Sequence, residues 1–301
     1  MNFITVLIPI FGIFAIGYIG KKALHIEVKP ISTMALYLMS PVLAFRTFYQ
    51  NSLNMEYVYL GAFLLLLCAG SIALCYIVSR LTHWDISERS GLILASSFMN
   101  NGNYGTPLVL LVFGEVGFHY AVILMVLQQL IMCTVGIFVA AQGSTGEHNQ
   151  KVNPLKEVVK FPVVYGALLG VIFNLVQVNL SSDIMTAVNM VSDATIPTVM
   201  IVLGMQLASI QLGKLETGKL SSALAIRLVI APVMAYVITL FLPVDDMLKD
   251  ILILMAAMPT AANTTMYALQ FNVKPAFVSS ATLISTISSI VTLPLLIAIL
   301  L

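Results

Sequence analysis

Ten apolar segments, each close to the length of a helix that crosses a bilayer, follow one another along the chain. The hydrocarbon core of a membrane needs roughly 20 mostly apolar residues per helix. Since 59% of the residues are hydrophobic and 9% are charged, the composition lies far outside that of soluble globular proteins. We therefore expect an all-α polytopic membrane protein with ten transmembrane helices. The segments are residues 3–20, 31–49, 57–79, 90–113, 118–141, 158–178, 184–209, 220–242, 248–271 and 276–300.

The fourth segment is interrupted by residues that weaken a helix. Residues 97–107 combine three asparagines, two glycines and a proline; asparagine side chains compete for backbone partners, glycine loses entropy, and proline lacks a donor. Thr106 and Pro107 suit the N-cap and the first position of a second half-helix, and Gly102 and Gly105 are expected to shape the break. Irregular backbone at membrane depth is tolerated only where it is buried in protein or lines a wet cavity. This stretch therefore predicts a binding site.

The ninth segment has a matching interruption, which begins at Pro259. Aligning residues 92–94 with residues 252–254 puts Asn103 opposite Asn263. Interrupted helices at corresponding positions of two halves point to the substrate site of a secondary transporter. We therefore expect two discontinuous helices that converge on one pocket.

The positions of the basic residues predict the orientation of the segments. Eleven of the fourteen Lys and Arg residues fall in connections that follow odd-numbered segments, so these connections should be cytoplasmic and both termini extracytoplasmic. Because each half contains five segments, residues 1–141 and 158–301 must enter the membrane in opposite directions. We therefore expect a five-plus-five inverted repeat, with residues 142–157 as a cytoplasmic linker.

Amides and hydroxyls near the two breaks are the candidate substrate contacts. Asn101, Asn103 and Asn263, with Thr106 and Thr264, offer donors and acceptors at a depth where unpaired groups are unfavourable. Alternatively, the amides satisfy backbone groups that the breaks set free. The amino-terminal ends of the half-helices favour an anion such as a carboxylate, whereas the carbonyls at the ends of the preceding half-helices suit a cation.

Three ionisable residues fall within apolar segments and need partners. Asp193 lies about ten residues into the seventh segment, too deep for its short side chain to reach water. It is a candidate site for a coupling proton or sodium ion, or one half of a structural ion pair. Arg46 either extends to the outer surface or pairs with Asp193. Arg227 has a planar guanidinium that fits a substrate carboxylate; the alternative is that it reaches the cytoplasmic surface. In the fifth segment, Gln128 and Gln129 are explained by packing between helices.

Several function classes are not expected. The net charge is +1 and the basic residues are scattered, so the sequence does not indicate a basic patch that would bind nucleic acid. The three cysteines and four histidines show no metal-ligand spacing, so no metal or cofactor is expected. A phosphate-binding G-x-x-x-x-G-K-[ST] motif, which direct use of ATP would require, does not occur. We rank an intramembrane enzyme last, because no paired acids or serine-histidine arrangement lies at matching depth.

On these residues the chain resembles the auxin efflux carrier family, including its bacterial malate- and malonate-permease-like members. The likeness rests on the ten segments, the run Asn100–Pro107 and the element Pro259–Asn263, and the short linker is similar to that of prokaryotic members. The resemblance implies that the two broken helices cross. It implies a scaffold of segments 1, 2, 6 and 7, often dimeric, and a moving domain of segments 3–5 and 8–10.

The resemblance also implies site residues and a substrate class. The residues of this chain that match the family's motif positions are Asn101, Asn103, Pro107, Pro259 and Asn263. Arg227 and Asp193 do not belong to these motifs. Family substrates are organic anions. We therefore expect a secondary transporter of a malate-like mono- or dicarboxylate, working by alternating access in the cell (inner) membrane as a homodimer within the lipid bilayer. A carboxylate channel or a membrane receptor is the alternative.

Overall fold

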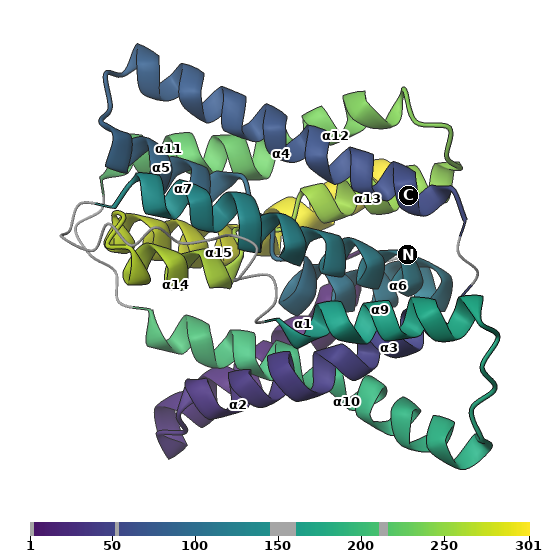
Figure 1. The fold of residues 1–301 in the computed structure, drawn as a ribbon. Coiled ribbons are helices and arrows are strands. Elements are labelled where there is room, and N and C mark those ends of the chain that lie inside the picture. The colour runs from purple at the N-terminus through teal and green to yellow at the C-terminus, as the bar shows by residue number, and fades with distance from the viewer. Residues whose placement is uncertain (1–2, 52–53, 145–160, 211–215) are drawn as a thin grey trace.

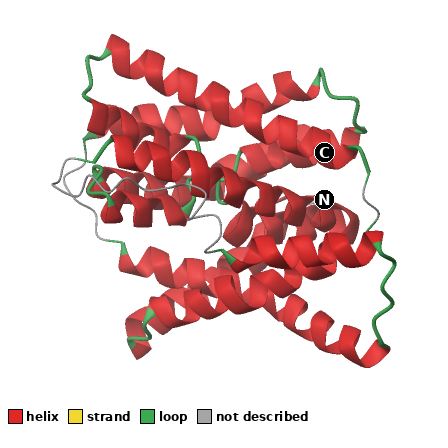
Figure 2. Ribbon diagram, viewed as in Figure 1, coloured by secondary structure: helices red, strands yellow, loops and turns green. Residues whose placement is uncertain are grey.

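The structure is a computed structural model that describes residues 3–51, 54–144, 161–210 and 216–301 (Figure 1). Within these ranges the regular structure is helical (Figure 2), apart from one isolated antiparallel bridge between Met99 and Thr260. The expected all-helical class is confirmed for this part of the chain. Most of the predicted linker, residues 145–157, lies outside the described residues.

The first half of the chain forms the helices that cover the first five expected segments. They are α1 (Phe3–Leu24), α2 (Val28–Met34), α3 (Ser40–Gln50), α4 (Glu56–Leu81), α5 (Ile86–Ser96), α6 (Thr106–Ile131) and α7 (Ile137–Gln142), with π-helical turns η1 (Ala35–Met39), η2 (Asn101–Gly105) and η3 (Met132–Gly136).

The second half forms the helices that overlap the remaining five segments. They are α9 (Pro162–Leu175), α10 (Ser182–Ser209), α11 (Thr217–Ala225), α12 (Ala231–Thr239), α13 (Asp246–Ala256), α14 (Ala262–Gln270) and α15 (Pro275–Leu300), with one π-helical turn, η4 (Ile226–Ile230).

Six helical stretches of the described chain are long and apolar enough to cross a bilayer, and α9 is a shorter apolar helix. These helices make the chain a polytopic membrane protein. The long stretches are Val28–Gln50, Glu56–Leu81, Asn101–Gln142, Ser182–Ser209, Thr217–Thr239 and Pro275–Leu300.

The connection between the fourth and fifth segments falls where we expected it, between residues 113 and 118. Two helices that share the label α6 meet there in a kink at Gly114, whose φ of 68° and ψ of −162° are not helical. Side chains other than hydrogen are strongly disfavoured in this backbone region. Glycine therefore lets the chain change direction without a loop.

Three of the four π-helical turns in the described chain end two residues before a proline. The turns η1, η2 and η4 precede Pro41, Pro107 and Pro232 respectively. A proline inside an α-helix lacks a donor and its ring clashes with the carbonyl four residues earlier. The wider π-helical turn moves that carbonyl away, so these helices continue through their prolines.

The helices gather into two groups, which we call the smaller and the larger bundle (Figure 1). The smaller bundle contains α1, α2, α3, α9 and α10, and the larger contains α4, α5, α7 and α11 to α15, with α6 between them. In the smaller bundle α1 packs along α10 and α3 along α9. A Cβ on Gly17 or Gly204 would overlap backbone carbonyls across the first pair, and one on Gly166 would do so across the second. Glycine therefore permits the close approach of these helices.

The two predicted breaks lie in the core of the molecule. Residues 90–101 and 251–261 are buried throughout. Neither break is a continuous helix that faces lipid, so the premise of a protein-enclosed break is met.

Candidate functional site

The two helix breaks pair with each other. Helix α5 ends at Ser96 and α13 ends at Ala256, and the chain is not helical again until η2 and α14. Asn100 N donates to the carbonyl oxygen of Pro259 at 2.9 Å, and Ala261 N donates to that of Phe98 at 3.0 Å. Each break therefore satisfies backbone groups that the other sets free. We call this arrangement the crossing.

Side chains from neighbouring elements fix the crossing further. The Thr260 hydroxyl donates to the Ala95 carbonyl at 2.5 Å, and the Thr260 backbone N–H donates to the Ser285 hydroxyl at 3.1 Å. Tyr104, fully buried, receives a hydrogen bond from the Ser289 hydroxyl at 2.9 Å. These bonds anchor both breaks to α5 and α15.

The cap of the second half-helix is not the one we predicted from the sequence. Asn100 is the N-cap, and its side-chain oxygen accepts from Asn103 N at 3.3 Å. Thr106 lies one turn further on, where its hydroxyl donates to the Asn101 carbonyl at 2.7 Å, and Pro107 lies in the first turn of α6. The prediction for Thr106 as a cap was wrong because η2 adjusts the backbone before the proline, so helical structure begins earlier.

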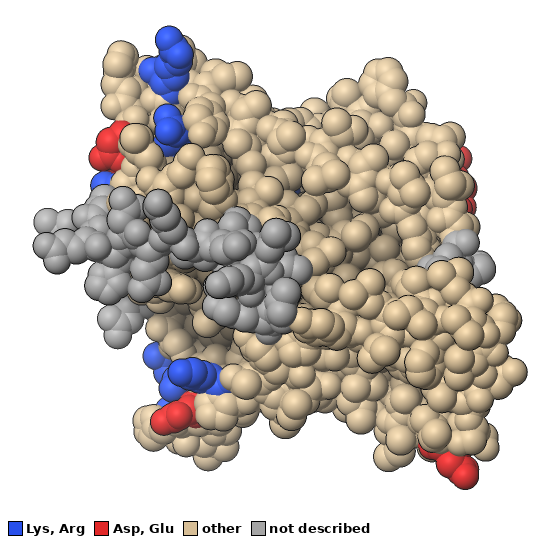
Figure 3. Space-filling view, viewed as in Figure 1, with Lys and Arg blue, Asp and Glu red and all other residues tan. Residues whose placement is uncertain are grey.

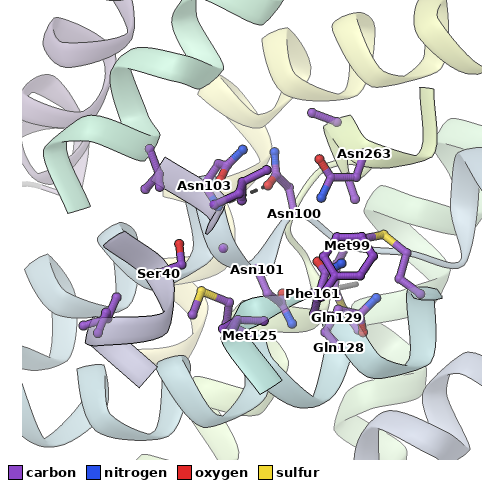
Figure 4. Close-up of a pocket in the computed structure, with 18 of the residues that line it drawn as sticks. Ser40, Met99, Asn100, Asn101, Asn103, Met125, Gln128, Gln129, Phe161 and Asn263 are labelled. Atoms are coloured by element: carbon purple, nitrogen blue, oxygen red, sulfur yellow. Dashed lines mark hydrogen bonds between the residues drawn. The ribbon is translucent and has the colours of Figure 1, made fainter. Parts of the chain in front are cut away.

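A pocket lies beside the crossing, where η2 and α14 begin (Figure 4). Its polar side chains are amides and the hydroxyls of Ser40 and Thr195, which donate to the carbonyls of Ala35 and Val191. Its other walls come chiefly from Met, Leu, Val and Phe side chains. Among the described residues that line it, none is charged. The lining amides are Asn100, Asn101, Asn103, Gln128, Gln129 and Asn263.

The crossing thus brings together the predicted amides Asn101, Asn103 and Asn263, of which the last two are 160 positions apart in the chain. In Figure 4 Asn100 and Asn103 lie close to Asn263. The predicted hydroxyls do not join them. Thr264 is buried and donates to the Ala261 carbonyl at 2.8 Å, and neither it nor Thr106 lines the pocket.

Several of the amide groups at this pocket have no protein partner within the described chain. Both side-chain polar atoms of Asn101 and of Gln128 are unpaired, as are Asn100 Nδ2 and Asn263 Oδ1. Asn101 is 1% exposed and Gln128 is 3% exposed. A buried polar group left unpaired costs about 1–3 kcal/mol, so a concentration of such groups around one pocket indicates a ligand site.

Gln128 is the site residue that sequence reasoning undervalued. Interhelical packing was the expected role for both glutamines of the fifth segment, but both line the pocket. Gln129 donates to Cys133 Sγ, four residues further along the same segment, at 3.1 Å, whereas both polar atoms of Gln128 are unpaired. An amide on an apolar helix gives the same sequence signal in both cases, because its partner is decided by the neighbouring helices.

The electrostatics of the pocket favour an anion. Helix α14 begins at the pocket, and its N-cap, Ala261, has no side chain that could accept a hydrogen bond. The first N–H groups of a helix lack intrahelical acceptors and carry partial positive charge. Since η2 and α6 also begin here, two helix N-termini and the amide donors surround the same space.

The structure places Arg227 away from this pocket. Its side chain is 1% exposed; Nη1 donates to the Ser96 carbonyl at 3.1 Å and Nη2 donates to the Ala256 carbonyl. These carbonyls belong to the last residues of α5 and α13. The sequence predicts a cation at such helix ends, and a guanidinium lies there. Arg227 is not among the residues that line the pocket, so the geometry gives no support to its predicted contact with substrate.

Arg46 and Asp193 form an ion pair in a separate polar depression. Arg46 Nη1 lies 2.5 Å from Asp193 Oδ1, and the Asp193 side chain is 70% exposed. The depression is also lined by Glu115 and His119 of α6. We expected Asp193 to be too deep to reach water, and its exposure contradicts this, because α10 borders the depression. Neither member of the pair lines the amide pocket.

An apolar cluster lies between the pocket and this depression. Leu43 of α3 lines the pocket, Phe118 of α6 lines the depression, and both pack with Val122. At the pocket's other side, a groove between the two bundles shares Ala262 with it and is bordered by Val28. The pocket is therefore closed by apolar side chains toward the Arg46–Asp193 pair and adjoins the groove on the other side.

Comparison with known proteins identifies the family. Residues 2–297 match the model of a family described as membrane transport protein. The chain is a member of this transporter family. It is the family of the auxin efflux carriers, so the resemblance inferred from the two breaks is confirmed.

Two archaeal relatives extend over nearly the whole transporter. An uncharacterized transporter of Methanothermobacter thermautotrophicus is 27% identical, covering 93% of this chain and 90% of its own. An uncharacterized transporter of Methanocaldococcus jannaschii is 24% identical, covering 93% of each chain. Together with the apolar helices, this membership makes the protein a multi-pass membrane transporter; members of such families are generally not enzymes.

Proposed function

We propose that this transporter is a secondary carrier of a small carboxylate anion, of the malate-like mono- or dicarboxylate class, in the cell membrane. One observation carries the proposal: unpaired buried amides and two helix N-termini surround a single uncharged pocket. Asn101, Asn103, Gln128 and Asn263 are the proposed substrate contacts, with Asn100 as the cap that holds η2 in place.

The chemistry of the amides narrows the substrate. A carboxylate accepts hydrogen bonds from amide N–H groups and from the first turn of α14. The unpaired oxygens of Asn101, Gln128 and Asn263 need a donor. A hydroxyl group on the substrate would supply it, which favours a hydroxy acid over a plain carboxylate.

We further propose alternating access between the two bundles, with the smaller bundle as a dimeric scaffold. The cluster of Leu43, Phe118 and Val122 would close one side while the groove beside Ala262 leads to the other. On the face seen in Figure 3, Lys and Arg gather at one end and the wide surface between the two ends is uncharged. This distribution supports a cytoplasmic position for that end, with both termini at the other.

The arrangement of the smaller bundle supports an inverted repeat. Under a five-plus-five relation the first segment corresponds to the sixth and the second to the seventh. The contact of α1 with α10 then corresponds to that of α9 with α3, and these are the two extensive contacts of the smaller bundle. Both use glycine for close approach.

Uptake into proteoliposomes tests the proposal, after a thermal-shift screen of purified protein against mono- and dicarboxylates has selected a ligand. Asn103→Ala and Asn263→Ala should each abolish saturable uptake and ligand-induced stabilisation while remaining folded. Asn54→Ala is the matched control, because this amide bonds Glu56 outside the pocket. Normal uptake by both pocket variants would contradict the site. Flux that neither saturates nor accumulates against a gradient would indicate a channel.

A further inference from the structure

Arg227 is a buried charge that the substrate pocket does not use. It lies in η4, and its guanidinium joins the carbonyl ends of α5 and α13 through Ser96 and Ala256. No acid in the described part of the chain forms an ion pair with it. Its hydrogen-bonding partners there are therefore backbone dipoles.

The charges at this point nearly balance. Each helix C-terminus carries the equivalent of about −0.5 elementary charge, so the two half-helices together present about −1 to the guanidinium. Arginine keeps its positive charge in proteins. In transporters with discontinuous helices, such carbonyl ends commonly coordinate a sodium ion. Here the chain itself supplies the cation.

We propose that Arg227 is the built-in cation of the crossing and occupies the position that a coupling sodium ion would otherwise fill. Its own helix and both of its partners belong to the larger bundle. The charge therefore travels with the crossing in every state and is not released. The crossing itself therefore requires no sodium ion. This holds whether or not the substrate is a carboxylate.

Thermal unfolding of the purified wild-type protein in detergent gives the first test. The midpoint is measured while NaCl replaces choline chloride at constant ionic strength. We expect no saturable change, because the carbonyls already have a cationic partner. A saturable rise in the midpoint with sodium would overturn the proposal. This measurement needs no variant, so it holds even if substitutions at Arg227 prevent folding.

Removing the guanidinium gives the second test. Arg227→Ala should lower the unfolding midpoint by roughly 6–20 °C. Millimolar methylguanidinium should restore part of the loss, and sodium should now stabilise the variant saturably. Arg227→Lys keeps the charge but replaces the forked guanidinium with a single ammonium nitrogen, so its unfolding midpoint should be intermediate and should respond to neither ion.

Arg46→Ala is the matched control, because it removes a guanidinium whose partner is an exposed carboxylate rather than a helix end. Neither ion should rescue it. A purely packing role for Arg227 would lower the midpoint of Arg227→Ala without rescue by methylguanidinium or sodium, and that result would contradict the proposal.

Discussion

The two sides of the crossing are built from the same kind of backbone and are completed in opposite ways. On the side where α5 and α13 end, Arg227 is bonded to both terminal carbonyls. On the side where η2 and α14 begin, the neighbouring side chains are uncharged amides, several without a protein partner. On the first side both terminal carbonyls have a donor within the protein, although Arg227 Nε has no partner in the described chain, and this side should stabilise the fold. The second side is left for a ligand and should destabilise the fold. By this criterion Arg227 is a structural residue and the unpaired amides are binding residues.

The largest change in stability should come from a substitution on the side where Arg227 bonds the terminal carbonyls. Arg227→Leu should lower the free energy of unfolding by about 3–5 kcal/mol, because two buried carbonyls lose their donors. Reversible denaturation in mixed micelles measures it. Arg46→Leu should change stability by less than about 1 kcal/mol, since its partner is exposed. Equal losses in the two variants would remove the contrast.

A substitution on the ligand side should change the stability in the opposite direction. Asn101→Leu should raise the free energy of unfolding by about 1–2 kcal/mol, because it removes a buried amide with two unpaired atoms. The same change should abolish stabilisation by the selected carboxylate. A variant that is less stable than the wild type and still binds would show that Asn101 is structural.

A change of similar size to that at Asn101 should come from the hydrogen bond between the second break and α15. Ser285→Ala leaves the buried Thr260 N–H without its acceptor at 3.1 Å. We expect a loss of about 1–2 kcal/mol, measured by the same denaturation. Ser279→Ala, in the first turns of α15, is the control, because that hydroxyl bonds only carbonyls of its own helix. Its stability should match the wild type within about 0.5 kcal/mol.

The smallest change in stability should come from the N-terminus of α5, where the Glu88 carboxylate complements the helix dipole. Glu88 belongs to the capping box of α5, and its hydrogen bond from Lys219 lowers the pKa of the Glu88 carboxyl. Because the folded-state pKa is depressed, this stabilisation is present above the unfolded-state pKa and is lost as pH falls through the folded value.

Unfolding midpoints measured from pH 7 down to pH 3 should therefore fall more for the wild type than for Glu88→Gln. The difference corresponds to less than about 1 kcal/mol, since the pair lies near the surface. An identical pH dependence in the two proteins would show that the pair contributes nothing.

Much of the architecture could be predicted because bilayer-spanning helices and their breaks depend on local composition. The apolar segments, the interruption near Asn103 and its counterpart near Asn263 follow from residues that disfavour helix or require lipid. The position of the first cap could not be predicted. Asn100 and Thr106 are both good caps, and the choice between them depended on η2, whose wider turn accommodates Pro107.

The partners of the polar residues could not be predicted either. Arg227 donates to a carbonyl 131 positions away, and Gln128 and Asn263 meet at a pocket formed by helices from both bundles. Nothing near these residues in the chain indicates which group they will face. Asp193 was expected to be buried because the sequence does not reveal the depression beside Arg46.

By itself, the sequence determined that this chain enters a membrane, where its helices must break, and that amides stand at those breaks. These properties are local, because backbone hydrogen bonding and transfer into lipid act on consecutive residues. Only the tertiary structure decided that the two breaks pair, that a guanidinium completes one side, and that unpaired amides face a pocket on the other. Those outcomes depend on which helices pack together, since a buried polar group takes its partner from whichever backbone or side chain lies beside it.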